Sequence, residues 1–288
     1  MIRYIKNKEI NRLKWDQRVI DSGNSRMYAL AGYLDSVTRS WDAIVLGKYE
    51  AILPIPIDRK WLLARSIFPP FVQQLGVIGT TDKDTIEDMI NMARKHFRRF
   101  QHQLNHENGK VNIDGLNSAM RTNYELDLHD SYEVLRRSYD KHLLRNLERA
   151  AANDLEYHES EAFAILESFI RKFSNRQDPS PKHLDKIKAI CDYKTELFRP
   201  SIYSVSINDE RVAVALAPQF GNRITLLIPR SSDEGRQYNA MAFLIDQLIQ
   251  QNAGKHRTLD FEGSMIPGVA RFYKQFGAID RPYFNIYK

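Results

Sequence analysis

The feature that most limits the fold of this chain is an order of predicted elements that occurs twice. Each half shows helices, a β-hairpin, a long helix and a strand, judged from the alternating and helical spacing of apolar residues. The hairpins are WDAIVLG with YEAILPIPI, and SIYSVSI with RVAVALAP around Asn208 and Asp209; the other strands include KVNIDGL, RITLLIP and LDFEG. The repeat predicts an α+β protein of two tandem units, each with a mixed, mostly antiparallel sheet flanked by helices.

The length of the chain agrees with two domains. Its 288 residues are enough for two units that each bury a core. We expect the boundary near 117–123, with one domain over 1–120 and the other over 121–288. Ligands often bind where two such units meet, so a cleft between the halves is the first place where we expect a site.

The composition is that of a globular protein with a basic charge balance. Hydrophobic residues make up 43% and charged residues 27% of the chain, and no apolar run reaches the length of about 18 residues that a membrane-spanning helix needs. The segment MIRYIKNKEINRLKW lacks the apolar core of a signal peptide, so we expect a cytoplasmic protein without a membrane span. The net charge of +6 favours partners that carry phosphate, such as nucleotides, coenzyme A, nucleic acid or anionic lipid.

The strand LDFEG provides the first candidate site. Because side chains alternate along a strand, Leu259 and Phe261 are expected to face the core. Asp260 and Glu262 then face the other side, where a carboxylate can accept the proton that an attacking amine loses in acyl transfer. Both are candidate catalytic residues; the alternative is that they anchor a loop or a helix terminus by hydrogen bonds. Ser264 is a candidate cap for the helix that follows.

The second candidate site is the predicted helix SYEVLRRSYDKHLLRNLERAAA. Its apolar residues form one stripe, and cations recur every four residues on another face, at Arg137, Lys141, Arg145 and Arg149. Such a stripe can hold phosphate groups, and Arg145 is our choice within it as a substrate-binding residue. The alternative is an ordinary solvated face, because acidic residues interrupt the positive charge.

Two further segments carry candidate binding residues. The strand RITLLIP runs through a polar loop into a predicted helix over 235–251, which would present free N–H groups and a positive dipole end to a pyrophosphate. The cofactor-binding candidates there are Arg230, Ser231, Ser232, Gly235 and Arg236, although a plain strand-to-helix connection would look similar. In IFPPFVQQLG, the amides of Gln73 and Gln74 can orient a ligand or can satisfy backbone groups of the loop.

The motifs of several enzyme classes are absent from the sequence. There is no HExxH, and a single cysteine, Cys191, cannot build a zinc knuckle and is expected to be a buried residue. The Walker phosphate loop, the Rossmann glycine fingerprint and the GxSxG nucleophile elbow are also missing. Nucleotide hydrolysis, dinucleotide redox chemistry and serine hydrolysis are therefore disfavoured.

Three segments together resemble one protein family. They are LDFEGSMIPGVARFYKQFGA, NYELDL with the RNLERA helix, and WDAIVLG with PPFVQQLG. Together, and in the right order over nearly the whole chain, they resemble the Fem-like branch of the GNAT acyltransferase superfamily. The resemblance implies two GNAT-type domains. It places the family motif Phe-Lys-x-x-Phe-Gly on 272–277, with Tyr273 at the lysine position and Lys274 beside it, and it implies substrate-binding roles for both. It also implies that the segment around Arg145 meets a substrate phosphate.

The resemblance implies an N-acyltransferase that uses acyl-CoA or aminoacyl-tRNA as co-substrate and holds no tightly bound cofactor. Its acceptor would be a small-molecule amine or a peptidoglycan precursor, and tRNA would be a partner if it carries the acyl group. Direct transfer needs a polarised carbonyl, a positioned amine and a proton acceptor, and no covalent enzyme intermediate. Two other readings remain open: a non-catalytic module that binds a phosphorylated or peptidoglycan-like ligand, and nonspecific RNA binding through the basic helix.

Overall fold

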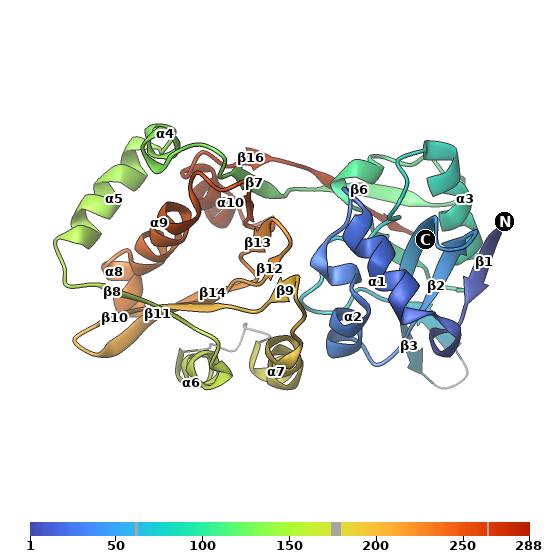
Figure 1. Cartoon of the computed structure of the whole chain (residues 1–288), viewed down its shortest axis with the longest axis horizontal. Coiled ribbons are helices and arrows are strands. Elements are labelled where there is room, and N and C mark those ends of the chain that lie inside the picture. The colour runs from blue at the N-terminus through green and yellow to red at the C-terminus, as the bar shows by residue number, and fades with distance from the viewer. Residues whose placement is uncertain (61–62, 174–179, 264) are drawn as a thin grey trace. The chain divides into compact units, whose positions relative to one another are not determined.

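The computed structural model of the chain divides into two compact units (Figure 1). The structure describes residues 1–60, 63–173, 180–263 and 265–288. Unit 1 comprises Met1–Thr122 together with Arg281–Lys288, and unit 2 comprises Asn123–Asp280. The C-terminal segment therefore belongs to unit 1, although unit 2 precedes it in the sequence.

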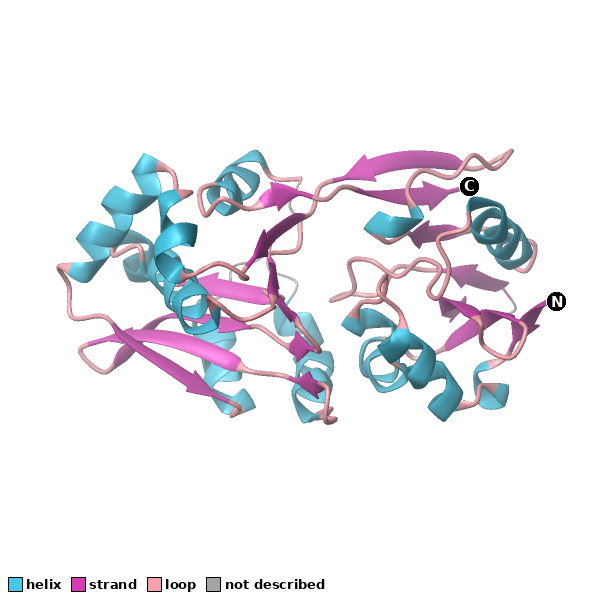
Figure 2. Ribbon diagram, turned by 45° about the horizontal axis from the view of Figure 1, so that its top comes forward, coloured by secondary structure: helices cyan, strands magenta, loops and turns pink. Residues whose placement is uncertain are grey.

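Unit 1 combines short helices with two antiparallel sheets (Figure 2). Its helices are η1 (Asn7–Glu9), α1 (Arg12–Asp21), η2 (Met27–Ala29), α2 (Ala31–Val37), α3 (Lys83–Arg94) and η3 (His106–Asn108). Its strands are β1 (Ile2–Ile5), β2 (Trp41–Leu46), β3 (Ala51–Lys60), β4 (Leu63–Ser66), β5 (Gln101–Gln103), β6 (Asn117–Arg121) and β17 (Tyr283–Tyr287). They pair in the orders β1-β2-β3-β4 and β5-β17-β6, so the C-terminal strand β17 lies at the centre of the second sheet.

The predicted hairpin of unit 1 is present as β2 and β3. Pro54 and Pro56 lie within β3 and are opposite Ala43 and Trp41 of β2, whereas β4 pairs with β3 only from Ile57 onward. A proline cannot donate to a neighbouring strand, which is why both occupy the part of β3 that β4 does not reach.

Unit 2 contains the longer helices and the larger sheets. Its helices are α4 (Tyr132–Arg137), α5 (Lys141–Ala151), α6 (Phe163–Phe173), η4 (Ser180–His183), α7 (Leu184–Asp192), α8 (Asp233–Gln237), α9 (Ala240–Asn252) and α10 (Pro267–Lys274). Its strands are β7 (Tyr124–Asp127), β8 (Glu156–Ser160), β9 (Phe198–Arg199), β10 (Ile202–Ile207), β11 (Glu210–Leu216), β12 (Gln219–Phe220), β13 (Arg223–Thr225), β14 (Ile228–Ser231), β15 (Thr258–Asp260) and β16 (Ile279–Asp280). The sheet orders are β14-β11-β10-β8 and β16-β7-β15-β13-β12-β9.

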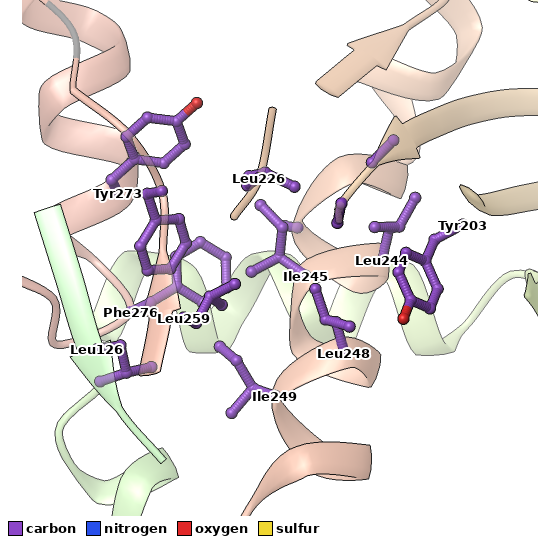
Figure 3. Packing of buried hydrophobic residues seen from close by; sticks show 14 of the residues in the cluster. Leu126, Tyr203, Leu226, Leu244, Ile245, Leu248, Ile249, Leu259, Tyr273 and Phe276 are labelled. Atoms are coloured by element: carbon purple, nitrogen blue, oxygen red, sulfur yellow. The ribbon is translucent and has the colours of Figure 1, made fainter. Parts of the chain in front are cut away.

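The core of unit 2 lies between its sheets and the helix α9. Figure 1 shows α5, α8 and α9 on one side of β10 and β11, and α6 and α7 on the other. Leu244, Ile245 and Leu248 of α9 are fully buried, and they meet Leu259 of β15 and Phe276 beyond α10 in one cluster (Figure 3). The tight turn of the predicted hairpin β10–β11 is also present, because Asn208 and Asp209 adopt the positive φ values of 49° and 63° that such a turn needs.

Three elements that the sequence predicts as continuous are interrupted, and each prediction was wrong at that point. The basic helix is two helices, α4 and α5, because the Asp140 carboxylate accepts the His142 N–H at 2.7 Å and caps a new helix. The stripe of cations therefore does not run on from Arg137 to Lys141. The helix over 235–251 is divided into α8 and α9 at Asn239, whose φ is 56°, and RITLLIP is divided into β13 and β14 between Thr225 and Ile228.

The segment that follows β15 agrees with the prediction in its apolar residues. Leu259 and Phe261 are buried in the core, and α10 begins at Pro267, with Ile266 in the N-cap position. Ser264, the predicted cap, lies outside the described residues. Gly277 has a φ of 79° just beyond α10, the left-handed conformation that commonly ends a helix. Among the described helices, none combines the length and the apolar character that crossing a membrane requires.

Candidate active site

The sheet of unit 2 opens where two parallel strands separate. β13 and β15 pair in parallel from Arg223 opposite Thr258 to Thr225 opposite Asp260. The N–H of Leu226 still donates to the Asp260 carbonyl at 2.7 Å. Beyond this point β14 pairs with β11. The chain after β15 remains next to β7, because the Phe261 N–H donates to the Tyr124 carbonyl at 2.9 Å. The two strands therefore diverge just after Asp260.

Asp260 lies at this point but is engaged on both oxygens. Its side chain is only 1% exposed, and Oδ2 accepts a hydrogen bond from Arg223 at 2.9 Å. Oδ1 accepts the backbone N–H of Glu262, also at 2.9 Å. Arg223 is in turn paired with Glu125 at 2.8 Å. These contacts are those of a structural anchor, the alternative considered above for a buried carboxylate at the end of a strand.

The carboxylate of Glu262 and the phenol of Tyr273 interact electrostatically beside the separated strands. Glu262 has left the strand, with a φ of 55°, and is half-buried. The Tyr273 ring of α10 packs against Phe261 at 5.0 Å between centroids, and its hydroxyl lies at the outer end, away from Leu259 and Phe276 (Figure 3). Burial is the main cause that raises the pKa of the Tyr273 phenol, and the negative charge of Glu262 is the second. The positive charge of Arg230 lowers this pKa in part. Since no hydrogen bond is described for that hydroxyl, it is a protonated donor available at the opening.

A cavity of about 360 Å³ opens between α5, α8, α9 and α10, and we name it the α9–α10 cavity. The polar and cationic side chains that line it are His142, Asn146, Ser231, Arg236, Asn239, Arg271 and Gln275. No carboxylate is among its lining residues. Arg236 is paired with the exposed Asp233 and donates to the Ser231 carbonyl at 2.9 Å, whereas no described partner holds the guanidinium of Arg271. The cavity therefore favours an anion.

The N-terminus of α9 adds backbone donors to this cavity. α9 has 13 residues, and its N-cap Asn239 makes no side-chain cap. Asn239, Met241 and Ala242 line the cavity. The N–H groups of the first turn have no described partner before Phe243, whose N–H donates to the Asn239 carbonyl at 3.1 Å. Free N–H groups at the positive end of a helix dipole are suited to a phosphate or carboxylate.

The predicted phosphate loop is only partly the site that the sequence suggested. Ser232 is 4% exposed, and its hydroxyl accepts the Gly235 N–H at 3.0 Å and donates to the Val212 carbonyl at 3.2 Å, so it caps α8. Gly235 lines the cavity, and a Cβ there would lie 2.1 Å from the Val212 oxygen, so glycine allows α8 to sit on β11. Arg230 donates to Ser180 at 2.7 Å and is not among the lining residues.

None of the other predicted residues is among those that line the α9–α10 cavity. Arg145 is exposed on α5, and the cavity is met instead by His142 and Asn146 of that helix. Lys274 is exposed, with its Nζ 5.4 Å from the centroid of the Tyr124 ring. In unit 1, Gln74 is fully buried; its Oε1 accepts the His106 N–H at 3.0 Å, and its amide donates to Gln73 at 2.9 Å. Gln74 therefore satisfies a backbone N–H group, which was the alternative to a ligand-binding role for Gln73 and Gln74.

Sequence reasoning missed the residues that complete the cavity. His142 and Asn146 are four residues apart on α5, and so are Arg271 of α10 and Gln275, the C-cap residue of that helix. This spacing places each pair on one helix face. A search of the sequence for polar pairs opposite the apolar stripes would have found both pairs. It would not have shown that two helices distant in the sequence bring them together. No group of three or more side chains that could hold a metal ion occurs among the residues that the structure describes.

The comparisons with known proteins concern the fold. No family model and no curated protein matches the chain. FemX matches with a TM-score of 0.68 at 12% identity over 96% of both chains. A tandem GNAT protein from the clavulanic acid biosynthesis pathway, solved without AcCoA, matches with a TM-score of 0.58 at 11% identity over 100% of this chain and 98% of its own. The C-terminal domain of a putative lysylphosphatidylglycerol synthetase from Agrobacterium fabrum matches with 0.57 at 11% over 96% and 91%.

At such low identity these similarities show the fold and not the reaction. The chain has the tandem GNAT fold, with mixed, mostly antiparallel sheets flanked by helices, as the sequence predicted. The fold that the resemblance to the Fem-like branch implied is thereby confirmed.

Proposed function

We propose that unit 2 transfers an acyl or aminoacyl group from a phosphate-bearing donor to an amine. The observation that carries the proposal is the α9–α10 cavity, where the unpartnered Arg271, the free N–H groups of α9 and the absence of lining carboxylates favour a phosphorylated ligand. The strand β14 joins the opening of the sheet to this cavity, since it begins two residues after Leu226 and its last residue, Ser231, lines the cavity. The fold supports the same proposal, because it is shared with the tandem GNAT protein of the clavulanic acid biosynthesis pathway.

In this mechanism the donor phosphates bind to Arg271 and Arg236 and to the N-terminus of α9. The Ser232 N–H donates to Val212 of β11, so by the alternation of an edge strand the preceding Ser231 N–H points away from β11. That N–H can polarise the donor carbonyl. The amine nitrogen then attacks the carbonyl carbon, and its bond forms as the bond from that carbon to the leaving sulfur or oxygen breaks.

Two side chains are assigned to the protons of this step. Glu262 takes the proton that the amine loses, directly or through water, while Tyr273 donates its phenolic proton to the leaving thiolate or alkoxide. Burial and the charge of Glu262 raise the pKa of Tyr273, so the phenol keeps its proton until negative charge develops on the leaving group. No covalent enzyme intermediate and no tightly bound cofactor are required. Asp260 positions Glu262 through its backbone N–H.

The donor is acyl-CoA or aminoacyl-tRNA, both of which carry phosphates and an activated carbonyl in one molecule. The acceptor is a small-molecule amine or the amino group of a peptidoglycan precursor.

Isothermal titration with coenzyme A and acetyl-coenzyme A tests the first donor. We expect saturable binding that weakens about tenfold in Arg271→Gln, the loss of one charge-assisted hydrogen bond. Arg281→Gln is the control, an exposed arginine of unit 1 outside the cavity, and should bind as the wild type does.

Turnover separates an enzyme from a binding module. Release of free thiol from acetyl-coenzyme A is followed with a panel of amines, and release of amino acid from aminoacyl-tRNA is followed in parallel. We expect Glu262→Gln to retain donor binding and to lose turnover. Binding that is tight and specific in the wild type but never followed by transfer would favour the non-catalytic module, and binding that Arg271→Gln leaves unchanged would move the donor away from this cavity.

A further inference from the structure

The three-stranded sheet of unit 1 presents a polar face that the proposed transfer reaction does not use. Asn285 and Tyr287 of β17 are two residues apart and point to the same side. Gln101 of β5 lies opposite Tyr287, and Ala119 of β6 lies opposite Asn285, so these side chains share that face with Arg121. Together with the end of β4 they line a cavity of about 700 Å³, which we name the β17 cavity.

The charge of the β17 cavity is positive and largely uncompensated. Arg65, Arg99, Arg121 and Lys288 line it, and no side-chain carboxylate does. Arg65 is paired with Asp58 at 2.6 Å, whereas no described partner holds the side chains of Arg99 and Arg121. These two guanidinium groups approach the cavity from different elements, the segment before β5 and the end of β6. They are placed as a clamp for an anion.

Unsatisfied polar atoms lie on the same face. The Nε of Arg121 is buried and has no hydrogen-bond partner, and the same holds for Oε1 of Gln103, two residues beyond Gln101 on β5. Buried polar atoms are almost always paired, so the unpaired donor of Arg121, which lines the cavity, calls for an acceptor from outside the chain. A bound ligand with acceptor groups would meet this requirement.

The remaining lining residues indicate more than a bare anion. Tyr287 is 39% exposed, and Phe68 is also partly exposed, so a planar group can lie on aromatic surface there. The amides of Gln101 and Asn285 can hydrogen-bond the edge of such a group. We propose that the β17 cavity binds a nucleotide, with its phosphates at Arg99 and Arg121 and its base on Tyr287. The volume lies within the range of about 300–1,000 Å³ that small-molecule sites occupy.

Binding of defined probes to the full chain tests this site. Pyrophosphate, adenosine, ADP and a single-stranded oligoadenylate are titrated calorimetrically at one fixed salt concentration. Because ADP can also enter the α9–α10 cavity, the titrations are repeated in an Arg236→Gln, Arg271→Gln double variant. We expect ADP to bind that variant more tightly than pyrophosphate or adenosine does. Arg99→Gln and Arg121→Gln should each weaken it about tenfold further.

The control is Arg98→Gln, an exposed arginine next to Arg99 that does not line the cavity. It should leave ADP binding unchanged. Tighter binding of oligoadenylate than of ADP would identify the end of an RNA strand as the source of the nucleotide, and equal or weaker binding would identify a free nucleotide. The proposal is overturned if no probe binds the double variant, or if Arg99→Gln and Arg121→Gln leave its binding unaltered. Either result leaves the transfer reaction of unit 2 untouched.

Discussion

Two segments, one in each unit, differ in how their polar groups are paired. In unit 1 the segment from Gln74 to Gly79 is held by asparagine side chains: Asn105 donates to the carbonyls of Leu75 and Val77 at 3.2 Å, and Asn24 donates to Val77 at 3.0 Å and accepts the Gly79 N–H at 3.1 Å. In unit 2 the side-chain hydrogen bonds of the segment from Ser231 to Ala242 end at Arg236. There the first turn of α9, Arg271 and the Tyr273 hydroxyl have no described hydrogen-bond partners.

The difference teaches how to separate structure from site in a duplicated fold. A buried polar group with all its partners inside the chain contributes to rigidity and leaves nothing for a ligand. A group without partners carries a desolvation cost that a ligand can remove. On this criterion Gln74 of unit 1 is structural, and the α9–α10 cavity of unit 2 is a site.

The largest effect is expected when the unpartnered hydroxyl of unit 2 is removed. Tyr273→Phe keeps the ring packed on Phe261 but removes the proton donor, so kcat should fall roughly a hundredfold or more while donor affinity stays near that of the wild type. Tyr157→Phe, on the edge strand β8, is the control. A kcat that survives in Tyr273→Phe would show that the leaving group takes its proton from elsewhere.

Removing one amide from the network of unit 1 should cost stability and not binding. Asn105 is fully buried, and Asn105→Ala removes the side-chain donor to the carbonyls of Asn24 and Leu75, one of the donors to Val77 and the side-chain acceptor of the Asn108 N–H. We expect a loss of about 4 kcal/mol in the free energy of unfolding. Chemical denaturation measures it, with Asn112→Ala, an exposed asparagine, as the control. A loss below about 1 kcal/mol would mean that the network does not hold the segment.

The same network predicts a pH dependence. Burial lowers the pKa of His102 to about 4, and its Nε2 accepts the Gly76 N–H at 3.3 Å, so the folded state holds the neutral ring. The unfolded chain protonates its histidine near pH 6.5, so folding stability should fall as the pH drops from about 6.5 to 4, by about 3 kcal/mol from this group. His102→Gln keeps an acceptor for Gly76 and should flatten this part of the profile. His256→Gln, on the surface, should not.

The smallest effect is expected at a glycine of the α9–α10 cavity. Gly235→Ala would place a Cβ 2.1 Å from the Val212 oxygen and should lower the free energy of unfolding by about 2 kcal/mol as α8 moves off β11. Gly268→Ala is the matched control, because Gly268 also lines the cavity but has nothing within 4 Å of its Cβ position. Denaturation midpoints compare the two. Equal stability would mean that α8 adjusts without cost.

Much of the fold and less of the site could be predicted from the sequence. The hairpins, the burial of Leu259 and Phe261 and the helix α10 follow from alternation, turn residues and helical spacing, which are local properties. The interruptions at Asp140 and Asn239 were missed, because a capping side chain and one left-handed residue override a favourable helical pattern. The sequence named Glu262 and Asp260 as catalytic candidates and Tyr273 as a substrate-binding residue, but it could not show that Arg223 and the Glu262 N–H occupy both oxygens of Asp260.

The sequence by itself determined the duplicated α+β architecture, since apolar periodicity sets which face of each element must be buried. Only the tertiary structure decided that β17, from the end of the chain, pairs between β5 and β6, and that His142, Ser231 and Arg271 meet in one cavity. The physical reason is the range of the interactions. Periodicity is read within a turn or a strand, whereas a site depends on which polar groups remain unpaired after distant elements have packed.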